Sequence, residues 1–170
     1  YHLSLYSMRG ERKRDYPPNL FYQQPWWDKE SNFSEYVSRL SYVMSEGKRD
    51  VDILVIHPIT TAWTIHSPFE NCNEVNSKIW EYNNAFDSLS LDMLANKLDH
   101  HYGDEIIMKN HAQIKNGKLC IGQHFYSTVI IPPALNLRTN TYNLLIKFKL
   151  ASKNNTLIII KPSPQFIDGK

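Results

Sequence analysis

A three-layer α/β fold, with helices on both faces of an open parallel sheet, is the fold class that the sequence predicts. Residues 51–58 read VDILVIHP, residues 128–132 read TVIIP and residues 156–161 read TLIIIK, and proline closes or follows each run. Continuous apolar runs of this length are typical of strands buried on both faces. Helical patterns over residues 73–98 and 139–151 separate the runs, which indicates right-handed crossovers within one parallel sheet.

The chain before the first of these strands has a different character. Residues 1–27 hold aromatic residues and prolines with little periodicity, and long irregular segments of this kind are usually functional or ordered by other contacts. Residues 28–47 are predicted to form an amphipathic helix. Its apolar residues recur at steps of three and four, at Phe33, Tyr36, Val37, Leu40, Val43 and Met44. We therefore predict two parts, residues 1–49 and residues 50–170.

The remaining elements are predicted from local signals. After the first strand, residues 59–73 are expected to form a loop, and residues 104–109, DEIIMK, are expected to form the second parallel strand. Asn116 and Gly117 predict a β-hairpin between residues 112–114 and 118–121, because both central positions of its tight turn need positive φ. The last eight residues are expected to form a loop.

The residues at the strand ends disfavour nucleotide binding and nucleophilic catalysis, and the cysteine spacing disfavours metal and redox sites. Residues 57–64, HPITTAWT, hold no glycine that would let backbone amides approach a pyrophosphate. The third strand ends in Ile131, Pro132 and Pro133 rather than in a nucleophile on a sharp elbow. Cys72 and Cys120 are far apart and have no CxxC spacing, so neither a zinc site nor a redox pair is supported. We therefore assign no catalytic residue, no metal ligand and no cofactor.

Charge and hydropathy bear on the partners. The net charge of +2 is too small to indicate a polyanion partner, and no basic stripe extends the patch at residues 9–14. No apolar run approaches the ~20 residues of a membrane helix. We expect neither nucleic acid nor a membrane as partner. The chain starts at Tyr1 and shows no secretory leader, so we expect a processed product or an excised segment, and the compartment is left open.

An aromatic and polar cluster near the end of the irregular segment is the first candidate site. Trp26 and Trp27 are adjacent, and aromatic faces stack on the CH-rich faces of sugar rings. The polar side chains that would bind sugar hydroxyls are Arg14, Asp15, Gln23 and Gln24. In the alternative interpretation the tryptophans plug the junction between the two parts of the chain, and we expect at least one of them to be structural.

The second candidate site is the carboxyl edge of the predicted sheet. Ligands of open α/β sheets bind at this edge, and His57 and Trp63 follow the first strand there. His57 has two interpretations. It contacts a ligand or a neighbouring domain, or it is a structural histidine that hydrogen-bonds to local backbone.

Three stretches together resemble a junction in large multidomain bacterial glycoside hydrolases of the α-L-rhamnosidase-like and related β-galactosidase-like kinds. They are LYSMRGERKRDYPPNLFYQQPWW (residues 5–27), YVSRLSY (residues 36–42) and VDILVIHPITTAW (residues 51–63). The resemblance implies that residues 1–49 are the C-terminal segment of a catalytic (β/α)8 barrel, a loop plus the last helix. It implies that residues 50–170 are a flavodoxin-like or amidotransferase-like accessory domain.

The resemblance also implies a function. The chain would be a non-catalytic part of a carbohydrate-degrading enzyme, scaffolding the barrel and bordering its sugar site, because the catalytic carboxylates of these enzymes lie on earlier barrel strands. Its partners would be carbohydrate through the parent enzyme, other domains of the same chain, and a further copy if the enzyme is a homo-oligomer. The compartment would be the bacterial cytoplasm or the exterior. The alternative is a stand-alone α/β binding or protein-interaction module with no link to glycosidases.

Overall fold

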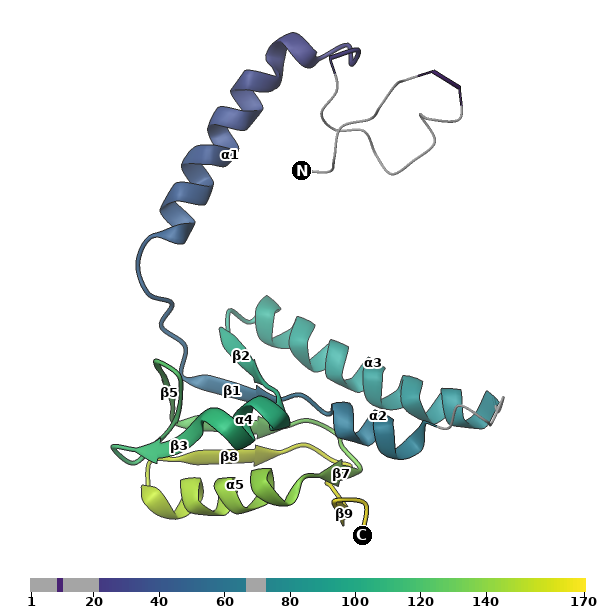
Figure 1. The fold of residues 1–170 in the computed structure, drawn as a ribbon, viewed down its shortest axis with the longest axis vertical. Coiled ribbons are helices and arrows are strands. Elements are labelled where there is room, and N and C mark those ends of the chain that lie inside the picture. Colours follow the sequence, from purple (N-terminus) through teal and green to yellow (C-terminus); the bar gives the residue numbers. More distant parts are fainter. Residues whose placement is uncertain (1–8, 11–21, 67–72) are drawn as a thin grey trace. The chain divides into compact units, whose positions relative to one another are not determined.

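The structure, a computed structural model, describes residues 9–10, 22–66 and 73–170 (Figure 1). The chain divides into two compact units, residues 1–49 and residues 50–170. The assignment of the first unit to a catalytic barrel stays a prediction.

The first unit contains the short 3-10 helix η2 (Trp27–Lys29) and the helix α1 (Glu30–Ser45). Helix α1 lies within the predicted range 28–47 and confirms the predicted helix. None of its side chains is buried among the described residues. The apolar stripe remains largely accessible, with exposed fractions of 64% for Tyr36, 48% for Leu40 and 67% for Val43. Within its own unit, the described residues therefore leave this stripe accessible.

The second unit is built on a four-stranded sheet in the order β2-β1-β6-β8. All three neighbouring pairs are parallel. The four strands are β1 (Ile53–Ile56), β2 (His100–Gly103), β6 (Thr128–Ile131) and β8 (Thr156–Ile159). The predicted α/β class with an open parallel sheet is confirmed.

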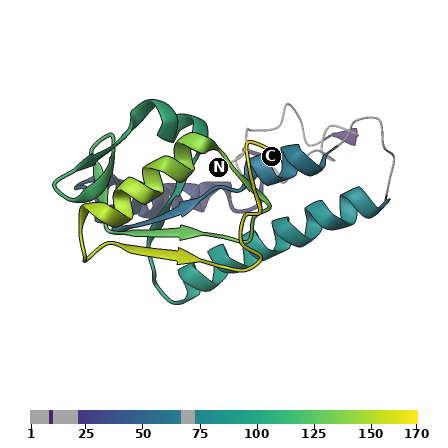
Figure 2. The same ribbon diagram turned by 90° about the horizontal axis from the view of Figure 1, so that it is seen from below.

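Helices lie on both faces of this sheet, which gives the predicted three layers (Figure 2). Helix α3 (Asn73–Ala95) covers one face through Met93, which packs with Val55 and Ile130. Helices α4 (Glu105–His111) and α5 (Thr139–Ala151) cover the other face. There the fully buried Phe148 of α5 joins the larger core, so both faces of the central strands are dry.

Asp52 interrupts the apolar run of the central strand for a structural reason. Its carboxylate accepts hydrogen bonds from the Ser127 backbone N–H at 3.0 Å, from the Ser127 hydroxyl and from Lys118 Nζ at 3.1 Å. These contacts join the start of β1 to the residue before β6. The charge stays at the half-exposed end of the sheet, where its solvation is retained.

Two of the predicted elements are wrong. Residues 104–109 were expected as the second strand, but they form most of α4, because Asp104 caps a helix: its carboxylate accepts from the N–H groups of Ile106 and Ile107 at 2.8 and 2.9 Å. Residues 100–103 form the strand instead. In Gly103 an added Cβ would lie 2.8 Å from Met108 Sδ, so only glycine allows this close approach of strand and helix.

The predicted loop after β1 is also wrong, since it contains the helix α2 (Ile59–Ile65). Its β-branched residues have low helix propensity, and packing overrides that preference because Thr60 and Thr61 are buried. The rest of the predicted loop, residues 67–72, lies outside the described residues.

The predicted hairpin is confirmed. Strands β3 (Ala112–Lys115) and β4 (Lys118–Ile121) pair antiparallel, and Asn116 and Gly117 between them have φ of 51° and 74°. A third strand, β5 (His124–Tyr126), extends the hairpin. Leu119 and Tyr126 of this small sheet pack in the same hydrophobic core as Phe148. Two further short strands, β7 (Asn136–Leu137) and β9 (Phe166–Ile167), pair in parallel near the carboxyl edge, so the last residues are not wholly a loop.

Candidate functional site

The carboxyl edge of the sheet gathers residues from three connections. Strand β1 leads through His57 and Pro58 into α2, and β2 leads through Asp104 into α4. The connection after β6 leads to β7 and α5. Parallel strands bring these connections to one edge, which is the usual ligand site of such folds.

Glu105 is the central polar residue of this edge. It is 1% exposed and lies in the first turn of α4. One carboxylate oxygen, Oε1, accepts from the Thr60 hydroxyl at 2.6 Å, and the other, Oε2, accepts from the Arg138 backbone N–H at 2.8 Å. A buried carboxylate needs such partners. Glu105 therefore joins α2, α4 and the start of α5, and both of its oxygens are used.

A second set of hydrogen bonds reinforces the same edge. The Thr61 hydroxyl oxygen accepts from the Leu135 backbone N–H at 3.0 Å. The Asn136 side-chain oxygen accepts from the Gly169 backbone N–H at 2.9 Å. Thr61 and Asn136 are 1% and 5% exposed. Their side chains therefore bind the backbone of the connecting segments and do not face solvent.

Trp63, a predicted site residue, lies on α2 at this edge. It is 54% exposed, and the Arg138 guanidinium carbon lies 5.7 Å from its ring centroid. This cation–π contact is within the range in which the ring quadrupole attracts a cation. Trp63 thus contacts Arg138, whose backbone N–H donates to Glu105. The partly exposed ring connects these buried contacts to the protein surface.

His57, the other predicted residue of this edge, is half-buried. Its backbone N–H donates to the Gly103 carbonyl oxygen at 3.0 Å, and its ring meets Phe86 edge-on at a centroid distance of 5.3 Å. The hollow beside it, between α2 and α3, measures about 80 Å³. Ligand pockets usually hold ~300–1,000 Å³. This geometry favours the structural interpretation of His57.

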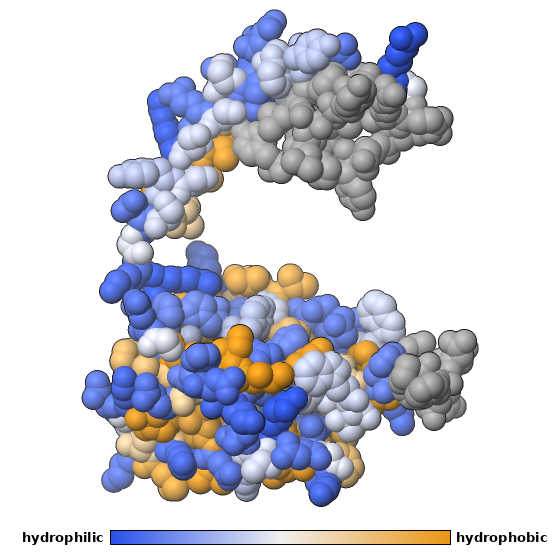
Figure 3. Space-filling view, viewed as in Figure 1, coloured by the Kyte–Doolittle hydropathy of each residue, from blue (hydrophilic) through white to orange (hydrophobic). Residues whose placement is uncertain are grey.

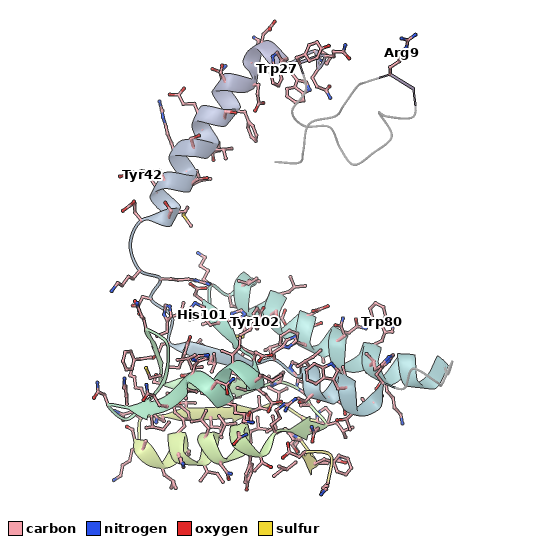
Figure 4. The ribbon with its side chains drawn as sticks, in the orientation of Figure 1. Arg9, Trp27, Tyr42, Trp80, His101 and Tyr102 are labelled. Carbon is pink, nitrogen blue, oxygen red and sulfur yellow. The ribbon has the colours of Figure 1, made fainter. Side chains whose placement is uncertain are left out.

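The other predicted site residues belong to the first unit. Gln23, Gln24 and Trp26 lie in the turns that lead into η2, whose first residue is Trp27 (labelled in Figure 4). The Trp27 N–H donates to the Gln24 carbonyl oxygen at 3.1 Å. Trp26 and Trp27 are 43% and 39% exposed. Arg14 and Asp15 lie outside the described residues. The segment thus carries two exposed indoles close in sequence to two amides, and the Gln23 Nε2 donates to the Tyr22 hydroxyl at 3.2 Å.

Neither nucleophile nor metal chemistry is assembled in the described part of the chain. Cys120 is buried, and its thiol donates to the Gly122 carbonyl oxygen at 3.7 Å. His101 and His124 lie with ring centroids 4.7 Å apart, and the His101 Nδ1 is 2.9 Å from the Tyr126 hydroxyl. Two imidazoles are too few for a metal site, and no group of three metal-binding side chains occurs among the described residues.

Sequence reasoning missed Glu105 and Arg138. The signal for Glu105 was present, because an aspartate followed directly by a glutamate is typical of the first turn of a helix. That signal was outweighed by the apolar run Ile106 to Met108, which also fits a strand. No local pattern marks Arg138, whose role depends on backbone placed by the sheet.

Comparison of the chain with protein-family models, with curated proteins and with solved structures finds no match to any of them. Among the helices of the described ranges, none has the length and apolar character that crossing a bilayer requires.

Proposed function

We propose that this chain is a non-catalytic part of a carbohydrate-degrading glycoside hydrolase. Its α/β unit, residues 50–170, serves as an accessory domain that scaffolds the catalytic barrel. Residues 1–49 contribute the last barrel helix and a loop that borders the sugar site.

The main support for this proposal is that the buried polar groups at the carboxyl edge of the sheet are bonded to the protein itself. Its buried carboxylate, Glu105, has both oxygens occupied by Thr60 and Arg138, and the hollow at His57 is about 80 Å³. The larger groove at the ends of β6 and β8, about 490 Å³, is lined mostly by apolar side chains. A catalytic α/β domain needs polar groups available to a ligand in a cavity of several hundred Å³. An edge whose polar groups hold its own connections supports a scaffolding role.

The accessible stripe of α1 supports the barrel assignment. Outer helices of (β/α)8 barrels bury an apolar stripe against the barrel strands. Tyr36, Leu40 and Val43 form such a stripe, and each of them is about half exposed or more. This is the pattern expected of a helix that packs on a partner surface.

The turn before α1 supports the sugar-bordering role. Trp26 offers a 43% exposed indole, and Gln24 and Gln23 lie two and three residues before it in the chain. An apolar face next to hydrogen-bonding amides matches the two surfaces of a pyranose ring.

The test is hydrolysis of a panel of aryl glycosides, including α-L-rhamnosides and β-D-galactosides, by the native-length protein that contains these residues. We expect release of the aryl alcohol from at least one glycoside, and none with the 170-residue chain alone. A folded native-length protein that hydrolyses no glycoside of the panel contradicts the proposal, and so does turnover by the 170-residue chain.

Two tryptophan variants of the native-length protein separate the sugar contact from general damage. Trp26→Ala is expected to lower kcat/KM by roughly two- to tenfold, as loss of an aromatic stacking contact does. Trp80→Ala is the matched control, because Trp80 is a 62% exposed indole on α3. Equal losses in the two variants would remove Trp26 from the sugar site.

The stand-alone binding or interaction module remains the second candidate. An apolar groove of about 490 Å³ beside β8 favours it, since this groove is large enough for a ligand or a partner segment. An inactive native-length protein would leave this candidate in place.

A further inference from the structure

Strand β8 lies at an end of the parallel sheet, yet its sequence is that of an interior strand. Residues 157–160 read LIII, with apolar side chains toward both faces. Ile158 and Ile159 are 42% and 50% exposed. Exposed edges usually carry charges, prolines or bulges, whereas runs apolar on both faces belong to strands with two neighbours.

The backbone of β8 is ready for a second neighbour. Thr156 N–H donates to the Ser127 carbonyl oxygen at 2.8 Å, and Ile160 N–H donates to the Ile131 carbonyl oxygen at 2.9 Å. In a parallel ladder alternate residues bond to the same neighbour. The N–H and C=O groups of Leu157 and Ile159 therefore point away from β6, toward the open edge.

A groove adjoins this edge on the α5 side. It holds about 490 Å³ between β8, α5 and residues 163–167. Leu157 and Ile159 line it from the strand, and Tyr142 and Ile146 line it from the helix. Apolar surface is visible over α5 in Figure 3. A strand added beside β8 would place every second side chain into this groove.

The charge around the edge selects the occupant. Lys149 lines the groove, and Lys153 and Lys161 lie in the chain just before and just after β8, with no acidic residue between positions 139 and 167. A second copy paired through the same edge would bring two basic surfaces together. A segment with acidic residues beside its apolar core complements them.

We propose that the β8 edge is a docking site for an extended partner segment with alternating apolar residues flanked by acidic ones. The segment pairs with the outward backbone groups of Leu157 and Ile159 and places its apolar side chains in the groove. This is recognition by β-strand addition, in which the main chain supplies binding and the pockets supply specificity. The inference does not depend on the glycosidase proposal.

The experiment uses a fluorescent peptide with an alternating valine and threonine core and two glutamates at each end, titrated with the 170-residue chain by anisotropy. We expect binding, slower hydrogen exchange at the Leu157 and Ile159 amides, and roughly tenfold weaker binding when lysines replace the glutamates. Two peptides N-methylated at alternate positions test the pairing. One places its methyl groups toward β8 and should not bind, while the other should bind.

Ile159→Gln is expected to weaken binding by roughly tenfold, whereas Leu91→Gln, at a 66% exposed site on α3, should leave it within about twofold. Both sites are accessible, so the two variants should keep the native circular dichroism spectrum. Equal binding of the two methylated peptides, equal binding of acidic and basic peptides, or no binding at millimolar peptide would overturn the proposal. A dimer in sedimentation that Ile159→Gln dissociates would assign the edge to a second copy and also overturn it.

Discussion

Replacing Glu105 by alanine tests whether the carboxyl edge is held by its buried carboxylate. The change removes the acceptors of the Thr60 hydroxyl and of the Arg138 N–H, both within the protein interior. Each buried donor left without a partner costs about 1–3 kcal/mol. The Thr60 hydroxyl can turn toward the Asn136 carbonyl oxygen, 3.4 Å away, so the Arg138 N–H is the donor left unpaired. Together with the cavity left by the side chain, we expect a loss of roughly 2–5 kcal/mol, a large part of the ~5–15 kcal/mol typical of a folded domain.

Glu105→Gln separates hydrogen bonding from charge. The glutamine oxygen can still accept from the Arg138 N–H, and its amide can donate to the Thr60 oxygen. The Thr60 hydroxyl then turns its proton toward the Asn136 carbonyl oxygen, 3.4 Å away. The second N–H of the new amide has no acceptor among these partners, so we expect a loss of about 1–3 kcal/mol, smaller than that of the alanine variant, which also leaves a cavity.

The assay is urea denaturation of the full chain, followed by the amide signals of Val129 and Phe148, which report on the second unit alone. A loss of 3 kcal/mol would lower the urea midpoint by about 1–3 M. Glu81→Ala, at an exposed glutamate of α3, is the control and should change stability by less than about 0.5 kcal/mol. The reasoning is refuted if Glu105→Ala is as mild as Glu81→Ala, or if Glu105→Gln is as damaging as Glu105→Ala.

Three further predictions concern other positions of the second unit. Gly103→Ala should destabilise the protein by about 1–3 kcal/mol, because its Cβ would lie 2.8 Å from Met108 Sδ; a thermal melt checks this, and an unchanged Tm would contradict it. Gly117→Ala should lower the free energy of unfolding by about 1 kcal/mol, because φ is +74° at this turn position. Chemical denaturation measures this loss, and an unchanged free energy of unfolding would contradict it. Partial burial raises the pKa of Asp52, but hydrogen bonds from Ser127 and Lys118 outweigh it, so its pKa lies below the ordinary 3.8. The stability it contributes is present above pH 3.8 and is lost as the pH falls through the lower folded value, so urea midpoints of Asp52→Asn should depend less on pH in that acid range. Equal pH dependence of variant and parent would refute this assignment.

The parts of the fold that were predictable are those whose signal is local and strong. The apolar run of β1 has side chains that suit burial on both faces, and Asn116 with Gly117 supplies a turn that few other residues allow. These signals do not depend on distant residues, so a strand and a hairpin could be predicted from them.

The failures occurred where distant packing decides the local structure. Strand β2 reads HHYG, without a β-branched residue, and it forms because its backbone pairs with β1 and Gly103 fits against Leu54 and Met108. Residues 105–108 have the composition of a strand, but Asp104 caps them as a helix. A single-sequence pattern cannot weigh these tertiary contacts against local preference.

The candidate site was predictable in position but not in role. His57 and Trp63 do lie at the carboxyl edge, as the strand order indicated. Their partners, the Phe86 ring and the Arg138 guanidinium, come from helices or connections far along the chain. These contacts give both residues structural partners, which only coordinates bring together, and their binding role stays a prediction.

The sheet order has a consequence for how the chain leaves the ribosome. Asp52 and Ser127, at the starts of two paired central strands, are 75 residues apart. At synthesis rates of ~5–20 residues per second, the apolar strand β1 waits roughly 4 to 15 s before its neighbour β6 is made. During that delay its sequence is a short, strongly β-forming stretch, the kind from which aggregates nucleate. The carboxylate of Asp52 then acts as a gatekeeper, because a charge at the end of such a stretch opposes pairing with another nascent chain.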